Sequence, residues 1–258
     1  MNASWRARHG FGCALALVLS SLALNQALRA AFESNAGFAD WVISHSLLVE
    51  DLRFFFRACL WLVIVYLFSR APAISSFLDQ AGLKQRPTFS GWIMAWTAVA
   101  LGSVLLILIT KGILQPNEVA AQQHVFGGAR WRFFIVQTGV LAPFYEEVVM
   151  RGFLYRAFRG SFQSLPSALL VVALDSVYFH WGLASRDLIA FLALIFGGLV
   201  LCAIRERTVS TWNCVLFHAV YNATVMRQWL ICLIVLGLVL AFCSRYSQPR
   251  TNCDTSPR

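Results

Sequence analysis

Charged residues are scarce in this sequence. Asp, Glu, Lys and Arg together make up 13% of the 258 residues, and 59% of the residues are hydrophobic. A soluble globular domain has roughly 25% charged and 45–50% apolar residues, so this composition excludes an ordinary soluble domain. The net charge of +9 does not indicate nucleic acid binding, because the Lys and Arg residues are spread over the junctions between apolar segments. We therefore expect an integral membrane protein with no nucleic acid partner.

Closely spaced cysteine pairs and internal repeats are also lacking. The seven cysteines include no Cys-x-x-Cys pair, and most of them lie in apolar segments, which argues against a disulfide framework and a cysteine-based metal site. The absence of a visible repeat counts against a transporter built from inverted repeats. The function must therefore be sought in the few polar residues of the apolar segments.

Apolar runs long enough to cross a membrane are abundant. The hydrocarbon core of a bilayer is about 30 Å thick and requires about 20 apolar residues per helix. Eight segments approach this length, which predicts an all-α, polytopic bundle of transmembrane helices that forms a single membrane domain over residues 1–258. The segments are about 11–31, 53–69, 91–111, 132–158, 164–182, 187–204, 208–226 and 228–244.

The distribution of basic residues predicts the orientation of this bundle. Lys and Arg concentrate in alternate loops and near both chain ends, whereas the first loop of the opposite set carries acidic residues such as Glu33 and Asp40. Basic residues favour the cytoplasmic side. We therefore expect a multi-pass protein with both termini in the cytoplasm. A prokaryotic inner membrane is its expected location. The segment from Lys111 to Arg132 is an exception, because it places basic residues on the other side.

Two adjacent carboxylates interrupt the apolar segment 132–158. They are Glu146 and Glu147, and Arg151 follows four residues after the second. A charge at mid-bilayer costs about 2.5–3.5 kcal/mol on translocon scales, so such residues usually mark a functional site. The spacing predicts an ion pair between Glu147 and Arg151, which leaves Glu146 free to act as a general base or acid. A purely structural ion pair is the alternative interpretation.

Two histidines lie in other predicted spans. His180 ends the segment 164–182, and His218 and Asn222 share one helix face of the segment 208–226. Each residue alone is commonly a hydrogen-bonded packing residue. Together with a free carboxylate, however, these groups could activate a water and stabilise the oxyanion of peptide hydrolysis. Asp175, five residues before His180, could tune this site or bond to a neighbouring helix.

These residues resemble the CPBP (CAAX protease and bacteriocin-processing, or Abi) family of intramembrane endopeptidases. The family pattern is a Glu-Glu-x-x-x-Arg helix, a Phe-x-x-x-His helix and a His-x-x-x-Asn helix, in that order. Glu146, Glu147 and Arg151 match the first motif, and His218 with Asn222 matches the third. The second motif is partial, because Ser176 precedes His180 where the family has Phe, and Cys202 replaces a glycine of the following helix. The resemblance covers about residues 135–225, which we expect to be the catalytic core.

The resemblance implies a helix bundle around an intramembrane catalytic cavity, with a role for each residue of the motifs. Glu146 and His180 would activate a water, Glu147 and Arg151 would organise the site, and His218 with Asn222 would stabilise the oxyanion. We expect no cofactor, but a divalent metal such as zinc is the alternative, since two His and a Glu form a familiar zinc set. The sequence lacks His-Glu-x-x-His, which favours the metal-free mechanism.

The expected substrate is a protein or peptide attached to the lipid bilayer by a lipid or a membrane anchor, cleaved near its end. Two other functions stay open. One is a non-catalytic membrane immunity or binding protein with the same fold, and the other is a proton-coupled transporter that uses the same buried carboxylates.

Overall fold

The computed structural model describes residues 5–88, 93, 135–180 and 188–225 of the chain. Throughout these residues the regular structure is helical, which confirms the predicted all-α class. The elements are α1 (Ala7–Ser34), α2 (Ala36–Ser44), α3 (Ser46–Ser69), α4 (Ile74–Gln80), η1 (Ile135–Leu141), α8 (Ala142–Glu147), η2 (Val148–Leu154), α9 (Tyr155–Arg159), α10 (Ser164–Phe179), α12 (Leu188–Thr208) and α13 (Thr211–Val225). The elements η1 and η2 are π-helical.

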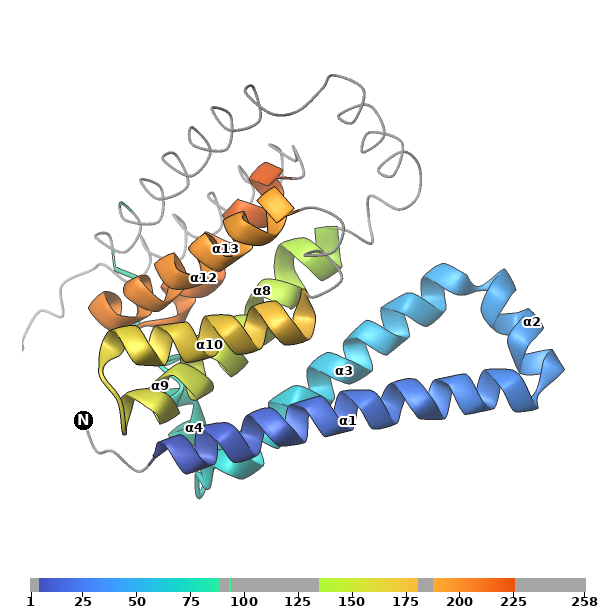
Figure 1. The fold of residues 1–258 in the computed structure, drawn as a ribbon, viewed down its shortest axis with the longest axis horizontal. Helices are drawn as coiled ribbons and strands as arrows, with labels where there is room; N and C mark the ends of the chain where they lie inside the picture. The colour runs from blue at the N-terminus through green and yellow to red at the C-terminus, as the bar shows by residue number, and fades with distance from the viewer. Residues whose placement is uncertain (1–4, 89–92, 94–134, 181–187, 226–258) are drawn as a thin grey trace, which may run out of the picture.

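The N-terminal part is a long helical hairpin. Helices α1 and α3 pack together and are joined by the short α2, which caps the far end of the hairpin in Figure 1. Cys13, Leu17 and Ser21 recur every four residues and form a buried stripe on α1. Across the interface, the buried Trp61 of α3 donates its indole N–H to the Ser21 hydroxyl at 3.0 Å. This polar contact aligns the two apolar helices.

The opposite face of the hairpin is exposed and apolar. On α1 this face includes Phe11, Leu15, Leu19 and Leu22, at helical spacing. Such a face is costly in water but is normal for a helix that faces lipid. Among the residues that the structure describes, two helical stretches are suited by length and composition to cross a membrane, Ala7–Ser34 and Asp51–Ser69.

The remaining helices form a second group beside the hairpin. Helices α10, α12 and α13 pack in sequence, and the stretch from η1 to α9 contacts both this group and α1 or α3 (Figure 1). The buried Phe153 and Phe158 of this stretch meet the N-terminal end of the chain through ring contacts with Trp5 and Phe11 respectively. The stretch from η1 to α9 is therefore the centre of the core, and it carries the adjacent glutamates.

A sharp turn joins α12 to α13. Val209 adopts a left-handed conformation with φ of 58°, which is uncommon for a β-branched residue. Its carbonyl accepts a hydrogen bond from Arg205. Gly82, with φ of 77°, packs against this turn, and a Cβ there would lie 2.6 Å from Arg205 Nη2. Glycine is therefore required at position 82 on both conformational and steric grounds.

Some helices extend beyond the predicted spans. Helix α3 begins at Ser46, although its stretch suited to cross a membrane, Asp51–Ser69, agrees with the predicted span of about 53–69. Helix α12 runs to Thr208, beyond the predicted span of about 187–204, and the short α2 and α4 were not predicted. α2 has nine residues and is too short to cross a bilayer, so a search for long apolar runs misses it. The predicted spans 91–111 and 228–244 fall outside the described residues, apart from Ile93.

Candidate active site

The glutamates lie where the helix changes from α to π geometry. Glu146 and Glu147 end α8, and η2 begins at the next residue. Short π-helical segments inside α-helices occur frequently at functional sites, because the extra residue in the turn shifts the side chains that follow it. The apolar pattern of the sequence did not reveal this change.

Glu147 is completely buried, and its carboxylate has two partners, Arg151 and His218. Its Oε1 accepts a hydrogen bond from Arg151 Nη1 at 3.2 Å, and His218 Nδ1 lies 2.8 Å from the same oxygen. The predicted ion pair between Glu147 and Arg151 is thus confirmed. The contact to His218 is additional, and it joins the first and third sequence motifs in space.

Arg151 links three helices. Besides Glu147, it donates from Nη1 to Asp175 Oδ2 of α10 at 3.4 Å and from Nη2 to the Gly198 carbonyl of α12 at 3.3 Å. A Cβ on Gly198 would lie 3.2 Å from Arg151 Nη2 and 3.0 Å from a methyl group of Val172. The glycine therefore permits the close approach of α12 to the buried guanidinium.

Glu146 has a different environment. Its Oε1 accepts a hydrogen bond from the Tyr145 hydroxyl at 3.0 Å, and its Oε2 lies 3.9 Å from His218 Nε2. The expectation that Glu146 has no partner is therefore wrong, because Tyr145 is its donor. Among the described residues, however, Glu146 has no ion pair with Lys or Arg, in contrast to Glu147.

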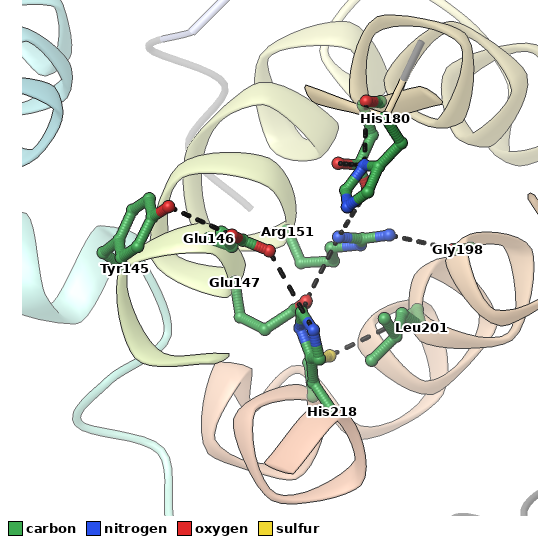
Figure 2. Close-up of polar contacts among 10 residues, drawn as sticks. Tyr145, Glu146, Glu147, Arg151, His180, Gly198, Leu201 and His218 are labelled. Carbon is green, nitrogen blue, oxygen red and sulfur yellow. Dashed lines mark hydrogen bonds and ion pairs between the residues drawn. The ribbon is translucent and has the colours of Figure 1, made fainter. Parts of the chain in front are cut away.

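His218 lies between the two carboxylates, as Figure 2 shows. Its Nδ1 contacts Glu147 and its Nε2 faces Glu146, so one imidazole reaches both groups. A carboxylate can only accept, so the Nδ1 hydrogen is directed to Glu147 and the orientation of the ring is set. The longer separation of 3.9 Å to Glu146 exceeds a hydrogen bond and leaves Nε2 available to a reacting group.

The first residues of α13 bond to the loop that follows α4, outside the cluster of glutamates. These bonds fix the helix that carries His218. Thr211 donates from Oγ1 to the Ala81 carbonyl at 2.5 Å, and Trp212 donates from Nε1 to the Leu83 carbonyl at 2.8 Å. The backbone N–H of Thr211 also bonds to the Gly82 carbonyl at 3.1 Å. The loop after α4 therefore fixes the first turn of α13, two turns before His218.

Arg205 supports the same region from α12. A basic residue near a helix end is usually exposed, but the Arg205 side chain is buried and donates from Nε to the Arg151 carbonyl at 3.2 Å. It also bonds to Val209 in the turn before α13. Its role in the structure is to join this turn to the helix that carries the glutamates.

His180 ends α10 on the other side of Arg151 (Figure 2). Its Nδ1 lies 3.3 Å from the Asp175 carbonyl and 3.7 Å from Asp175 Oδ1. Asp175 also contacts Arg151, so His180 is connected to the glutamate cluster through one buried carboxylate. Asp175 thus bonds to a neighbouring helix, which is one of the two roles that the sequence left open, and the residue that it bonds there is Arg151.

Asn222 lies one turn after His218 on α13 and is partly buried. The structure thus brings Glu146, Glu147, Arg151 and His218 into one cluster and connects His180 to it through Asp175, and Asn222 lies on the helix that carries His218. Sequence reasoning missed Tyr145, although a tyrosine beside two glutamates in an apolar helix is a detectable signal.

A divalent metal site is the alternative interpretation of these His and Glu residues. Within the part of the chain that the structure describes, no group of three His, Cys, Asp or Glu side chains is arranged to hold a metal ion. The paired carboxylates, the imidazole between them and the second imidazole beyond Arg151 provide groups that can accept and donate protons in a largely buried setting. These are the functional groups that hydrolysis of an amide bond requires.

Comparison with known proteins supports this chemistry. No curated protein and no solved structure matches the chain. One family model matches residues 128–224, which include all the candidate site residues, and its description is type II CAAX prenyl endopeptidase Rce1-like. With the two apolar helices of the hairpin, this match indicates a membrane protein. The predicted resemblance is confirmed, because residues 128–224 of the chain match the model of the Rce1-like family of CAAX prenyl endopeptidases.

Proposed function

We propose that this protein is an intramembrane endopeptidase that cleaves a peptide bond near the end of a membrane-attached protein or peptide. The observation that carries the proposal is the position of His218 between two carboxylates, of which only Glu147 is paired with an arginine among the described residues. A structural ion pair would need Glu147 and Arg151 alone. Glu146 and His218 add a base and a polar group that face each other in a mostly buried site.

In this proposal Glu146 acts as the general base, assisted by His180. Glu146 takes a proton from a water as the water oxygen attacks the carbonyl carbon, and the proton then passes to the leaving amine as the C–N bond breaks. Glu147 and Arg151 hold His218 in place by their hydrogen bonds. His218, protonated on both ring nitrogens so that Nε2–H also donates, and Asn222 stabilise the negative charge on the carbonyl oxygen.

The proposal includes the membrane architecture. The chain would form a single domain over residues 1–258 with eight spans, with its catalytic core at about 135–225 around an intramembrane cavity. Both termini would lie in the cytoplasm of a prokaryotic cell with the protein in the inner membrane. The exposed apolar face of the hairpin supports contact with lipid. The bilayer and a lipidated or membrane-anchored substrate would then meet at the same site.

The test is cleavage of a panel of prenylated and membrane-anchored peptides by protein purified in detergent. Glu146→Gln keeps the shape of the side chain and removes the base, so we expect kcat to fall by about 10²- to 10⁴-fold. Glu33→Gln is the matched control, because Glu33 is an exposed glutamate of α1 that pairs with Arg29 far from the site. The control should retain wild-type activity.

A strong chelator added to the wild-type protein separates the two mechanisms. Unchanged cleavage supports the metal-free mechanism, and loss of cleavage that zinc restores supports the metal alternative. If the wild type cleaves no peptide of the panel, the endopeptidase proposal is contradicted and the non-catalytic immunity or binding protein becomes the better hypothesis.

A further inference from the structure

One arginine of the N-terminal hairpin reaches the candidate site. Arg57 of α3 donates from Nη2 to the Tyr145 hydroxyl at 3.2 Å, and this hydroxyl donates to Glu146 Oε1 at 3.0 Å. Helix α3 lies outside the matched residues 128–224. Arg57 therefore reaches Glu146 through Tyr145 from a part of the chain outside the matched residues.

The two hydrogen bonds have a defined direction. A guanidinium has only donors, so the Tyr145 oxygen must accept from Arg57. The single hydroxyl hydrogen of Tyr145 is then directed to Glu146, whose carboxylate can only accept. Arg57 thus fixes the orientation of the hydroxyl, and the hydroxyl in turn fixes one oxygen of Glu146.

Aromatic residues hold both donors in place. The Tyr145 ring is buried and makes edge contacts with Phe54 and Trp61, each with ring centroids 5.4 Å apart. The Arg57 guanidinium lies over the same two rings, at 5.3 Å from the centroid of Phe54 and 5.6 Å from that of Trp61. Phe54, Arg57 and Trp61 share one face of α3 by their spacing. Cation–π contacts of this type stabilise a guanidinium in an apolar setting.

The geometry points to Arg57 and Tyr145 as positioning residues for the proposed base. They hold Glu146 through Oε1, and this leaves Oε2, which lies 3.9 Å from His218 Nε2, as the oxygen that takes the proton. This inference rests on the proposed function and deepens it, because it assigns the reacting oxygen and adds α3 to the catalytic machinery. Arg57 acts through Tyr145 and does not touch the reacting atoms.

The test compares Tyr145→Phe and Arg57→Gln with the wild type on a peptide that the wild type cleaves. A misplaced catalytic group can cost up to about 100-fold in rate, and we expect kcat to fall about 10- to 100-fold with KM unchanged. Because both residues act on the same oxygen, the double variant should be no slower than the slower single variant. Arg57→Lys retains a donor and should recover part of the loss.

Two matched controls show whether the effect is specific. Arg53→Gln removes an arginine one turn earlier on α3 whose guanidinium bonds to Asn25 of α1 at 2.7 Å. Tyr155→Phe removes a tyrosine hydroxyl that donates to Glu206 at 2.9 Å. Both controls should retain wild-type kcat. Thermal unfolding in detergent identifies any variant that fails to fold, and Tyr145→Phe, which removes one oxygen atom, then decides the result.

The outcomes separate this inference from the function on which it rests. Normal kcat in Tyr145→Phe and Arg57→Gln, combined with an inactive Glu146→Gln, would overturn the inference alone. Losses that multiply in the double variant, or that appear in KM, would also overturn it, because they indicate separate structural effects. A wild type that cleaves no peptide would overturn the proposed function and this inference with it.

Discussion

Two glutamates of this protein, Glu146 and Glu206, each lie beside a tyrosine and an arginine, but they are bonded differently. Near the end of α12, Arg159 donates to both oxygens of Glu206 at 2.7–3.1 Å, and Tyr155 adds a third donor at 2.9 Å. The negative charge is therefore directly neutralised. This carboxylate joins α9 to α12 and has a structural role.

At the candidate site the order of the groups is different. The tyrosine lies between the arginine and the carboxylate, so the Arg57 guanidinium bonds to the Tyr145 oxygen and only the hydroxyl bonds to Glu146. The carboxylate gains orientation without direct neutralisation by a guanidinium. The comparison shows that the same three residue types can form a direct salt bridge or a chain of hydrogen bonds in which the tyrosine separates the arginine from the carboxylate. The order in which the three side chains contact each other decides which arrangement forms.

The largest expected difference between the two regions is in stability. Glu147→Gln removes the main partner of the buried Arg151, and breaking a buried ion pair costs roughly 3–5 kcal/mol. Glu206→Gln removes a partner of the half-exposed Arg159, and such pairs are worth about 0–1 kcal/mol. Unfolding in detergent with increasing denaturant would measure both. Equal losses would contradict the distinction between a buried site and a peripheral salt bridge.

A second prediction concerns the geometry of Arg151. Lysine keeps the charge but lacks the planar fork, so it cannot serve Glu147, Asp175 and the Gly198 carbonyl together. We expect Arg151→Lys to lower kcat by roughly 10- to 100-fold. Arg159→Lys is the matched change at the other glutamate and should leave peptide cleavage unchanged. A fully active Arg151→Lys would show that only the charge is needed.

A smaller effect is expected where α12 approaches the guanidinium. The added methyl group of Gly198→Ala meets Val172 and Arg151 at 3.0 and 3.2 Å, and such overpacking costs about 1–3 kcal/mol. Gly197→Ala is the control, since its methyl group would meet nothing within 4 Å among the described residues. That change should be neutral or stabilising, because alanine favours a helix. Thermal unfolding of both variants gives the comparison, and a loss in Gly197→Ala would contradict it.

The smallest expected effect is a pH dependence at Glu206. The hydrogen bonds from Arg159 lower the pKa of the Glu206 carboxyl below its ordinary value. The salt bridge therefore adds stability at neutral pH, and this contribution is lost as the pH falls through the folded-state pKa. We expect the small difference in melting temperature between wild type and Glu206→Gln to disappear in acid. A difference that grows in acid would have the wrong sign for this interpretation.

The sequence predicted the parts of the site that lie within one helix. The ion pair of Glu147 with Arg151 follows from a spacing of four residues, and it is present. The π-helical segments on either side of α8 were not predicted, because apolar residues on all sides of this helix conceal a change of helical period. The same uniform hydrophobicity made the helix limits uncertain.

Contacts between distant residues could not be read from the sequence. Arg57 and Tyr145 are 88 positions apart, and Glu147 and His218 are 71 positions apart. Their pairing depends on how α3 and α13 rotate and pack against the stretch from η1 to α9. Arg205 illustrates the same limit, since a basic residue near a helix end is usually exposed, but here it is buried against the Arg151 carbonyl.

The sequence by itself predicted the all-helical class, the membrane character, the motifs that resemble the CPBP family and the pairing of Glu147 with Arg151. Hydrophobic content and spacing along a single helix are local properties, and these conclusions depend on nothing else. Only the tertiary structure decided that His218 lies between the two glutamates and that a tyrosine oriented by Arg57 holds Glu146. Helix packing brings these side chains together, and it depends on the shapes of all the contacting faces at once.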